Sequence, residues 1–130
     1  MLDLVALFDG YEHLLLVSPA VARFSLLKWR VLEREGYIRV RAELAEGGLL
    51  EFSEFWAGAA NGDPARQEYA YHWQNAKEQL VCRWDNVNHH LHLPFAPHHA
   101  HLTNDQVEGV ADPPDLAAVL REIEGQLGYT

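Results

Sequence analysis

The sequence predicts an α+β fold in which a C-terminal helix packs on one face of a twisted antiparallel sheet of about four to six strands. The evidence is an alternating apolar and polar run over residues 37–56, two aromatic-rich runs at 66–74 and 80–86, and apolar residues at helical spacing near the C-terminus. With 130 residues, 48% of them hydrophobic, the chain is expected to form a single domain over residues 1–130.

The first 36 residues carry the weakest pattern. Ser18 followed by Pro19 is typical of a helix start and predicts a short helix over residues 19–28, while the apolar run Leu14–Val17 fits either a strand or a helix. The N-terminus is acidic where a signal peptide is basic, and no run approaches the roughly 20 apolar residues of a membrane span. A lone Cys82 can form no disulfide within the chain. We therefore expect a cytoplasmic protein with no membrane partner.

Residues 37–56 predict a β-hairpin. Apolar side chains from Ile38 to Leu44 alternate with polar ones, and the segment 46–48 supplies a three-residue loop with two glycines. This loop sets three pairs, which are Ala42 with Phe52, Leu44 with Leu50, and Glu43 with Glu51. Like charges directly opposite each other destabilise a sheet unless an arginine, a proton or a metal ion offsets them.

A second hairpin is predicted from the runs 66–74 and 80–86, joined by residues 75–78. If Gln74 opposes Gln79, large side chains share one face in three pairs, which are Tyr69 with Trp84, Tyr71 with Cys82, and Trp73 with Leu80. A shift of one residue would expose these rings, so the hydrophobic pattern supports the assignment of faces.

The C-terminal third is predicted to be a loop followed by a helix. Residues 87–114 show no helical or strand period and hold six histidines, which indicates an ordered loop over the sheet. The helix begins near Pro113 and Pro114 and can end at Gly128. Its apolar stripe, expected to cover the apolar face of the sheet, consists of Leu116, Val119, Leu120, Ile123 and Leu127.

Strand parity gathers ionic side chains on the sheet face that points away from this helix. These are Arg39, Arg41, Glu43, Glu51, Ser53, Glu68, His72, Arg83 and Asp85. The face is either a binding or catalytic surface or a solvated face on which arginines pair with carboxylates. Parity places Glu54 on the core face instead, where a bulge that turns it outward is favoured over pairing with a buried partner.

Two histidine clusters with the same spacing follow the second hairpin. The first is His89, His90 and His92, and the second is His98, His99 and His101. In one interpretation His90 joins His99 or His101, completed by Asp85, to bind zinc or another transition metal. In another, a loop histidine works with His72 and Arg83 in acid-base cleavage of a phosphodiester without a metal. Individual histidines can also serve only to hydrogen-bond the loop backbone.

The charge distribution permits an RNA partner despite a net charge of −9. A uniformly acidic protein repels a polyanion, but six of the ten basic residues fall within 23–41. This locally basic segment is compatible with RNA, and it is equally compatible with an ordinary solvated hairpin.

Four motifs follow one another along the chain: Tyr71-His72-Trp73, Arg83-Trp84-Asp85-Asn86, His89-His90 and Pro97-His98-His99-Ala100-His101. In this order they resemble the TumE-type toxin family of prokaryotic toxin-antitoxin systems, and the similarity extends over about residues 37–127. The resemblance implies a helix-turn-helix antitoxin as partner. The chain departs from the family pattern at Asn88, where a proline is usual, and at His92, which is local to this sequence. Family-matched site residues are His72, Arg83, Asp85, Asn86, His89, His90, His98, His99 and His101.

The leading hypothesis is a toxin that acts on RNA as a ribonuclease requiring no cofactor. Its catalytic residues are taken to be His72, Arg83, Asp85, His98 and His99, and its substrate-binding residues Arg39, Arg41 and Asn86. The alternative is a non-catalytic metal-binding or protein-interaction module organised by the histidine-rich loop, with His90, His99 and His101 as metal ligands. A homodimer is compatible with either hypothesis.

Overall fold

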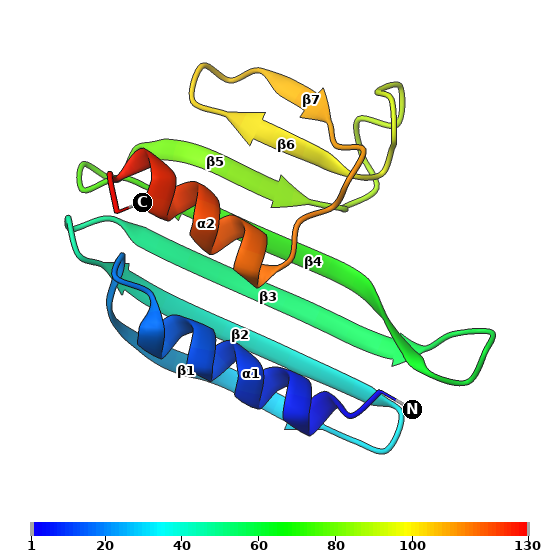
Figure 1. The fold of residues 1–130 in the computed structure, drawn as a ribbon. Helices are drawn as coiled ribbons and strands as arrows, with labels where there is room; N and C mark the ends of the chain where they lie inside the picture. Colours follow the sequence, from blue (N-terminus) through cyan, green and yellow to red (C-terminus); the bar gives the residue numbers. More distant parts are fainter. Residues whose placement is uncertain (1, 130) are drawn as a thin grey trace.

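Alternating side chains build one large antiparallel sheet with an apolar and a polar face (Figure 1). The computed structural model describes residues 2–129, which form seven strands and two helices. The strand bounds are β1 Val21–Val31, β2 Glu35–Leu44, β3 Leu49–Gly58, β4 Pro64–Gln74, β5 Leu80–Asp85, β6 His99–Leu102 and β7 Val107–Gly109. Neighbours in the sheet are neighbours in sequence, and the helices α1 (Leu4–Val17) and α2 (Leu116–Gln126) cover one face. The α+β class is confirmed, with more strands than expected.

The N-terminal region differs from the prediction. Ser18 ends α1 instead of starting a helix, because its N–H donates to the Leu14 carbonyl at 3.1 Å. Its hydroxyl donates to Glu124 of α2 at 2.7 Å and so ties the two helices together. The predicted helix over 19–28 is wrong, since β1 occupies this region and pairs with β2. Two register irregularities interrupt β1 and break the alternation that marks a strand in the sequence.

The loop of the first hairpin lies one residue earlier than predicted. Leu44 N donates to Gly48 O, so the three loop residues are 45–47, and Gly47 takes the positive φ (102°) that the last position of such a loop requires. The register therefore shifts by two residues, and the observed pairs are Val40 with Phe52, Arg41 with Glu51, and Ala42 with Leu50. A shift of two leaves every side chain on its predicted face, but it removes the predicted Glu43–Glu51 pair.

The second hairpin shows a similar two-residue shift. Asn75 N donates to Gln79 O, and Glu78 takes a positive φ of 63° in the loop between them. A register irregularity between Trp73 and Gln74 adds to the shift, and the observed pairs are Tyr71 with Trp84, Trp73 with Cys82, and Gln74 with Leu80. Tyr71 and Trp73 are buried as expected.

The C-terminal helix follows the prediction closely. Asp115 caps α2 by accepting a hydrogen bond from Ala118 N at 2.9 Å, and the predicted stripe is buried at Leu116, Val119, Leu120 and Ile123. Two short strands, β6 and β7, form within the segment expected to be a loop, because β5 offers its open edge to β6. In the described part of the chain, no helix is long and apolar enough to cross a membrane.

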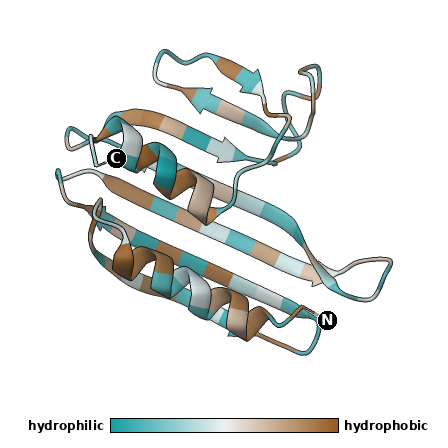
Figure 2. Ribbon diagram, viewed as in Figure 1, coloured by the Kyte–Doolittle hydropathy of each residue, from teal (hydrophilic) through white to brown (hydrophobic). Residues whose placement is uncertain are grey.

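The core lies between the two helices and the sheet, where hydrophobic positions of both layers meet (Figure 2). Its largest fully buried side chains include Phe8, Leu15, Ile38, Phe52 and Tyr71. Figure 2 shows hydrophobic and hydrophilic residues alternating along the central strands, and in β2 and β3 buried residues alternate with more exposed ones in the same way.

Glu54 stays in this core, so the expected outward bulge is wrong. The β3 register irregularity follows Glu54, between Phe55 and Trp56, and does not turn it outward. Its carboxylate, 1% exposed, accepts hydrogen bonds from the Tyr11 hydroxyl at 2.6 Å and from the Tyr71 hydroxyl. Further donors are Trp56 Nε1 at 2.8 Å and Arg66 Nη1 at 3.3 Å. A buried carboxylate with a cation and several donors is tolerated where an unpaired one is not.

Candidate functional site

Two rows of side chains cross the polar face, and the strand register defines both. The first row contains Ser25, Arg41, Glu51, His72, Arg83 and His101 from β1 to β6. The second row contains Lys28, Arg39, Ser53, Ala70, Asp85 and His99. Antiparallel neighbours in a row are about 4.5–5.5 Å apart at Cβ, so each row is a continuous line of side chains.

Two arginines share one carboxylate near the middle of the rows. Arg39 Nη2 lies 2.5 Å from Glu51 Oε2, and Arg41 contacts Oε1 through Nη2 at 2.8 Å and Nε at 3.0 Å. Burial raises the pKa of Glu51, but these hydrogen bonds outweigh it and the net pKa is lowered. Glu43 instead pairs with Arg23 at 3.0 Å on the exposed edge.

His72 stands between Glu51 and Arg83 in the first row. Its Nε2 lies 3.1 Å from Gln74 Oε1, an acceptor, so the neutral imidazole carries its proton on Nε2. Nδ1 is then the atom with a free lone pair. The half-buried ring is positioned to accept a proton from a bound molecule.

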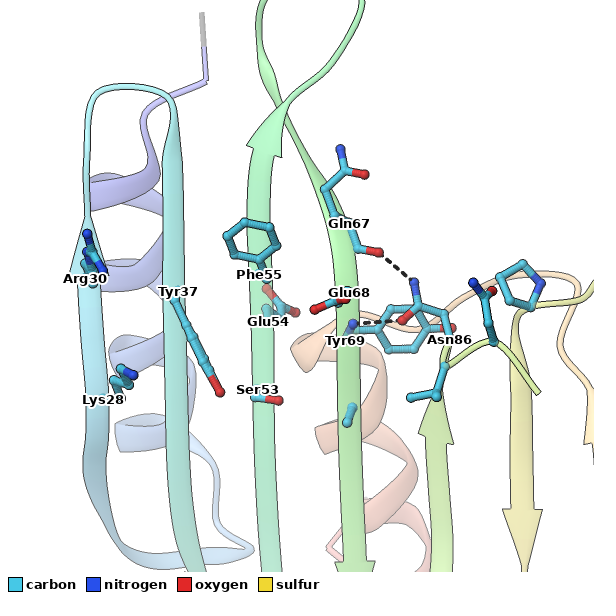
Figure 3. Close-up of a pocket in the computed structure, with 14 residues that line it drawn as sticks. Lys28, Arg30, Tyr37, Ser53, Glu54, Phe55, Gln67, Glu68, Tyr69 and Asn86 are labelled. Carbon is cyan, nitrogen blue, oxygen red and sulfur yellow. Dashed lines mark hydrogen bonds between the residues drawn. The ribbon is translucent and has the colours of Figure 1, made fainter.

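Two neighbouring hollows open on the polar face, and His72 lines the smaller of them. The smaller, of about 390 Å³, is lined by Arg39, Arg41, His72 and Arg83 among others. The larger, of about 630 Å³, has a wall that includes Lys28, Arg30, Tyr37, Phe55 and Asn86 (Figure 3). Both hollows include Ser53 and Ala70, whose small side chains leave space at the centre of the sheet.

Asn86 borders the larger hollow but its amide is engaged with the backbone. Its Oδ1 accepts from Tyr69 N at 3.0 Å and its Nδ2 donates to Gln67 O at 3.0 Å (Figure 3). The side chain thereby continues the pairing of β4 past the end of β5. Its predicted role in substrate binding stays a prediction, and the structure shows it holding the rim of the hollow.

Asp85 is the centre of a buried polar cluster at the other end of the rows. Its Oδ1 accepts from Val87 N at 3.0 Å and lies 3.0 Å from His99 Nε2. Its Oδ2 accepts from Arg83 Nε at 3.1 Å and lies 3.8 Å from His101 Nε2. Asp85 thus links the arginine of the first row to two of the predicted histidines.

His98 and His99 point to different sides of the sheet. His99 is 1% exposed and belongs to the polar-face cluster, while His98 Nδ1 lies 2.9 Å from the Tyr69 hydroxyl on the helix side. Burial and the nearby Arg66 cation lower the pKa of His98. The structure therefore brings neither ring to His72 as an accessible acid: His98 faces the other layer and His99 is covered.

The loop over residues 86–98 places its histidines against this cluster. The His90 ring lies 5.2 Å from the His99 ring and 5.6 Å from the His101 ring, centre to centre, and His89 lies 5.6 Å from His99. His92 contacts His90 alone among the histidine rings described, at 6.2 Å. Desolvation first, and then the neighbouring imidazoles, lower the pKa of His90.

Two overlapping sets of side chains could hold a metal ion. In each set the ligand atoms lie within 4.8 Å of one another: one is Asp85, His99 and His101, and the other is His89, His90 and His99. The predicted ligands His90, His99 and His101, with Asp85, are thus brought together across the two sets.

The aromatic wall of the larger hollow was not predicted from the sequence. Tyr37 and Phe55 face each other across β2 and β3, and Lys28 Nζ lies 5.4 Å from the centre of the Tyr37 ring. Strand alternation could have placed Tyr37 on the polar face, because it has the same parity as Arg39 and Arg41. The face of Lys28 could not be predicted in this way, because register irregularities interrupt the alternation in β1.

Comparison with known proteins gives a family. The family model described as Toxin TumE matches residues 11–127, which is most of the chain. The match starts well before the first of the motifs, which contains His72. No curated protein and no solved structure matches the chain.

Proposed function

Because the chain belongs to the TumE toxin family, we propose that it is the toxin of a toxin-antitoxin system and that it binds single-stranded RNA in the joined hollows and cleaves it with the help of His72. The observation that supports this is the gathering of arginines, paired aromatic rings and an accessible imidazole on one open sheet face. A helix-turn-helix protein is the proposed antitoxin.

Phosphate binding would fall to the cations around the hollows. These are Lys28, Arg30, Arg39, Arg41 and Arg83. Arg39 and Arg41 contact Glu51 through one edge of each guanidinium, which leaves other N–H groups for phosphate oxygens. This local cluster overcomes the acidic average of the chain at short range, because at physiological salt charges beyond about 8 Å are screened.

Base binding would fall to Tyr37 and Phe55. Sequence-tolerant proteins stack bases on aromatic rings for about 1–3 kcal/mol per base, alongside a basic groove for the backbone. The larger hollow combines both features, and Phe55 lies one strand over from His72 and four residues farther along, which is roughly 14 Å away. The arrangement favours unpaired RNA, whose bases are free to stack.

Cleavage would use the 2′-hydroxyl as nucleophile. His72 Nδ1 takes the hydroxyl proton, the 2′ oxygen attacks phosphorus, and the bond to the 5′ oxygen breaks as that oxygen takes a proton from water. The products are a 2′,3′-cyclic phosphate and a 5′-hydroxyl. Arg83, opposite His72 in β5, would stabilise the extra negative charge of the pentacoordinate phosphorus.

Expression of single-residue variants tests the proposal. The chain is induced in a host without its antitoxin while growth and total RNA are followed. His72→Ala should slow RNA cleavage by about 10²–10⁴-fold and relieve toxicity, and Arg83→Ala should do the same. Matched controls on the helix side, His13→Ala and Arg121→Ala, are exposed and should stay toxic.

Three results would contradict parts of this proposal. If the host grows normally when the unaltered chain is induced, the chain is not toxic in that host, whether through RNA or through another target. Full toxicity of His72→Ala with unchanged RNA termini would leave binding without cleavage. Loss of toxicity in His13→Ala as well would show that the assay follows folding and not the hollow.

A further inference from the structure

His99 has an unusual set of neighbours for a buried imidazole. Its Nδ1 lies 2.8 Å from the Pro97 carbonyl oxygen, and because a carbonyl only accepts, Nδ1 carries a hydrogen. In the neutral ring the lone pair is then on Nε2. That atom is inaccessible to solvent and has no hydrogen-bond partner among residues 2–129, yet it lies 3.0 Å from Asp85 Oδ1. Two acceptors this close repel each other unless a cation lies between or beside them.

A proton on Nε2 explains this contact poorly. A ring N–H points along the plane of the imidazole, and the Asp85 oxygen lies off that direction, since the pair is close in distance but fails the geometry of a hydrogen bond. A metal ion placed beside both atoms removes the repulsion without requiring the oxygen to lie on the N–H axis. The donation from Nδ1 to a backbone carbonyl is also the usual second contact of a metal-bound histidine.

We propose that Asp85, His99 and His101 bind a divalent transition metal of the zinc class, and that His90 completes the site from the loop. Imidazole nitrogen with one carboxylate oxygen is a donor set that zinc accepts. This inference is independent of the proposed action on RNA.

The spacing of the ligand atoms fits a tetrahedral ion. Zinc bonds of about 2.0–2.2 Å at tetrahedral angles place ligand atoms about 3.3–3.6 Å apart. His99 Nε2 lies 3.0 Å from Asp85 Oδ1 and His101 Nε2 lies 3.8 Å from Asp85 Oδ2, so each imidazole is near that spacing from one of the two carboxylate oxygens. His90, whose ring approaches both other imidazoles, is the loop residue that can close the fourth position.

Such an ion would fasten the loop to the sheet. Residues 86–98 have no regular secondary structure and reach the sheet where Gly109 in β7 has no side chain. The Pro94 carbonyl oxygen fills this space, only 1.9 Å from where a Cβ would lie. An ion bound by both His90 and the histidines of β6 would add a second anchor between the loop and the sheet. Asp85 would connect this ion to Arg83 through their 3.1 Å contact.

Metal content of the full chain, produced without a histidine tag, tests the site. After dialysis without chelator, we expect about one zinc per chain, and Co²⁺ added to stripped protein should give the visible absorption of tetrahedral coordination. Asp85→Asn and His101→Ala should each weaken zinc binding by at least about tenfold. His90→Ala should weaken zinc binding less than His101→Ala does. His92→Ala is the matched control, since it lies in the same loop outside the site.

Two outcomes overturn the proposal. Unaltered protein that holds no zinc and shows no rise in Tm on adding Zn²⁺ has no such site. Equal loss of zinc in His92→Ala and His101→Ala indicates an adventitious surface ion held by the histidine-rich loop as a whole. Asp85→Asn keeps the size and the acceptor for Val87 N, so a circular dichroism spectrum like that of the unaltered chain separates lost binding from lost folding. Because the readout is metal and not growth, failure here leaves the RNA proposal intact.

Discussion

Replacing Arg66 with methionine should destabilise the protein strongly, because it leaves the Glu54 carboxylate buried without its cation. The Arg66 side chain is 16% exposed and that of Glu54 is 0% exposed, so water cannot replace the lost partner. Burial raises the pKa of Tyr11 and of Tyr71, so both phenols stay protonated donors but contribute no charge. Removing one partner of a buried pair costs about 3–5 kcal/mol.

The expected change in Tm follows from the size of the chain. At about 2.1 cal/mol/K per residue, the unfolding entropy of 130 residues is about 0.27 kcal/mol/K, so a loss of about 3–5 kcal/mol lowers Tm by about 11–18 °C. Thermal and urea unfolding followed by circular dichroism measure both quantities. Arg121→Met, on the exposed side of α2, should stay within about 0.5 kcal/mol of the unaltered chain.

A second substitution identifies the cause of the loss. Glu54→Gln removes the charge and keeps an oxygen that accepts from Tyr11, so Arg66→Met combined with Glu54→Gln should be more stable than Arg66→Met alone. The reasoning is refuted if Arg66→Met costs less than about 1 kcal/mol, or if adding Glu54→Gln lowers stability further. Either result would mean that the carboxylate does not depend on the arginine.

Three further measurements probe other parts of the fold. Burial raises the pKa of Cys82 to about 12, so iodoacetamide at pH 8 should modify unfolded chains only; rapid modification of the native protein would contradict its burial. Gly109→Ala forces the Pro94 carbonyl to move and should cost about 1–3 kcal/mol, whereas Gly10→Ala on open α1 surface should stabilise by up to about 1 kcal/mol. The pKa of Glu51 is lower in the folded than in the unfolded chain, so its stabilising effect is complete above the ordinary carboxyl pKa and is lost as pH falls through the lowered value. Glu51→Gln should flatten this acid limb of a stability curve, and an unchanged limb would contradict the role of its two arginines.

Side-chain faces could be predicted from the sequence, but the pairing register could not. The faces of Arg41, Glu51 and His72 follow from a period of two, which any even shift preserves. The register depends on whether Gly47 or Gly48 takes the positive φ. Since both are glycines, the sequence permits either choice, and the structure places it at Gly47. The predicted Glu43–Glu51 repulsion was therefore an error of one loop position, and the true neighbour of Glu51 is an arginine.

Contacts between distant segments account for what the sequence did not reveal. Glu54 looked misplaced because its partners Tyr11 and Arg66 come from α1 and β4, and strand alternation carries no information about either. His98 and His99 looked equivalent because their spacing repeats that of the first cluster. Their positions diverge because His99 begins β6 and pairs with Asp85 of β5, whereas His98 precedes the strand and contacts the Tyr69 hydroxyl.

The proposed RNA site and the proposed metal site share one structural link, and its geometry predicts the direction of any coupling. Arg83 has one guanidinium edge on Asp85 and stands beside His72 in the first row. A metal ion on Asp85 draws negative charge away from Arg83, so the guanidinium would bind a phosphate more strongly with the ion present than without it. Zinc should therefore tighten RNA binding in the unaltered chain and leave it unchanged in Arg83→Ala. Because coupling between two ligands is reciprocal, RNA should raise zinc affinity by the same factor, and coupling that persists in Arg83→Ala would exclude this link.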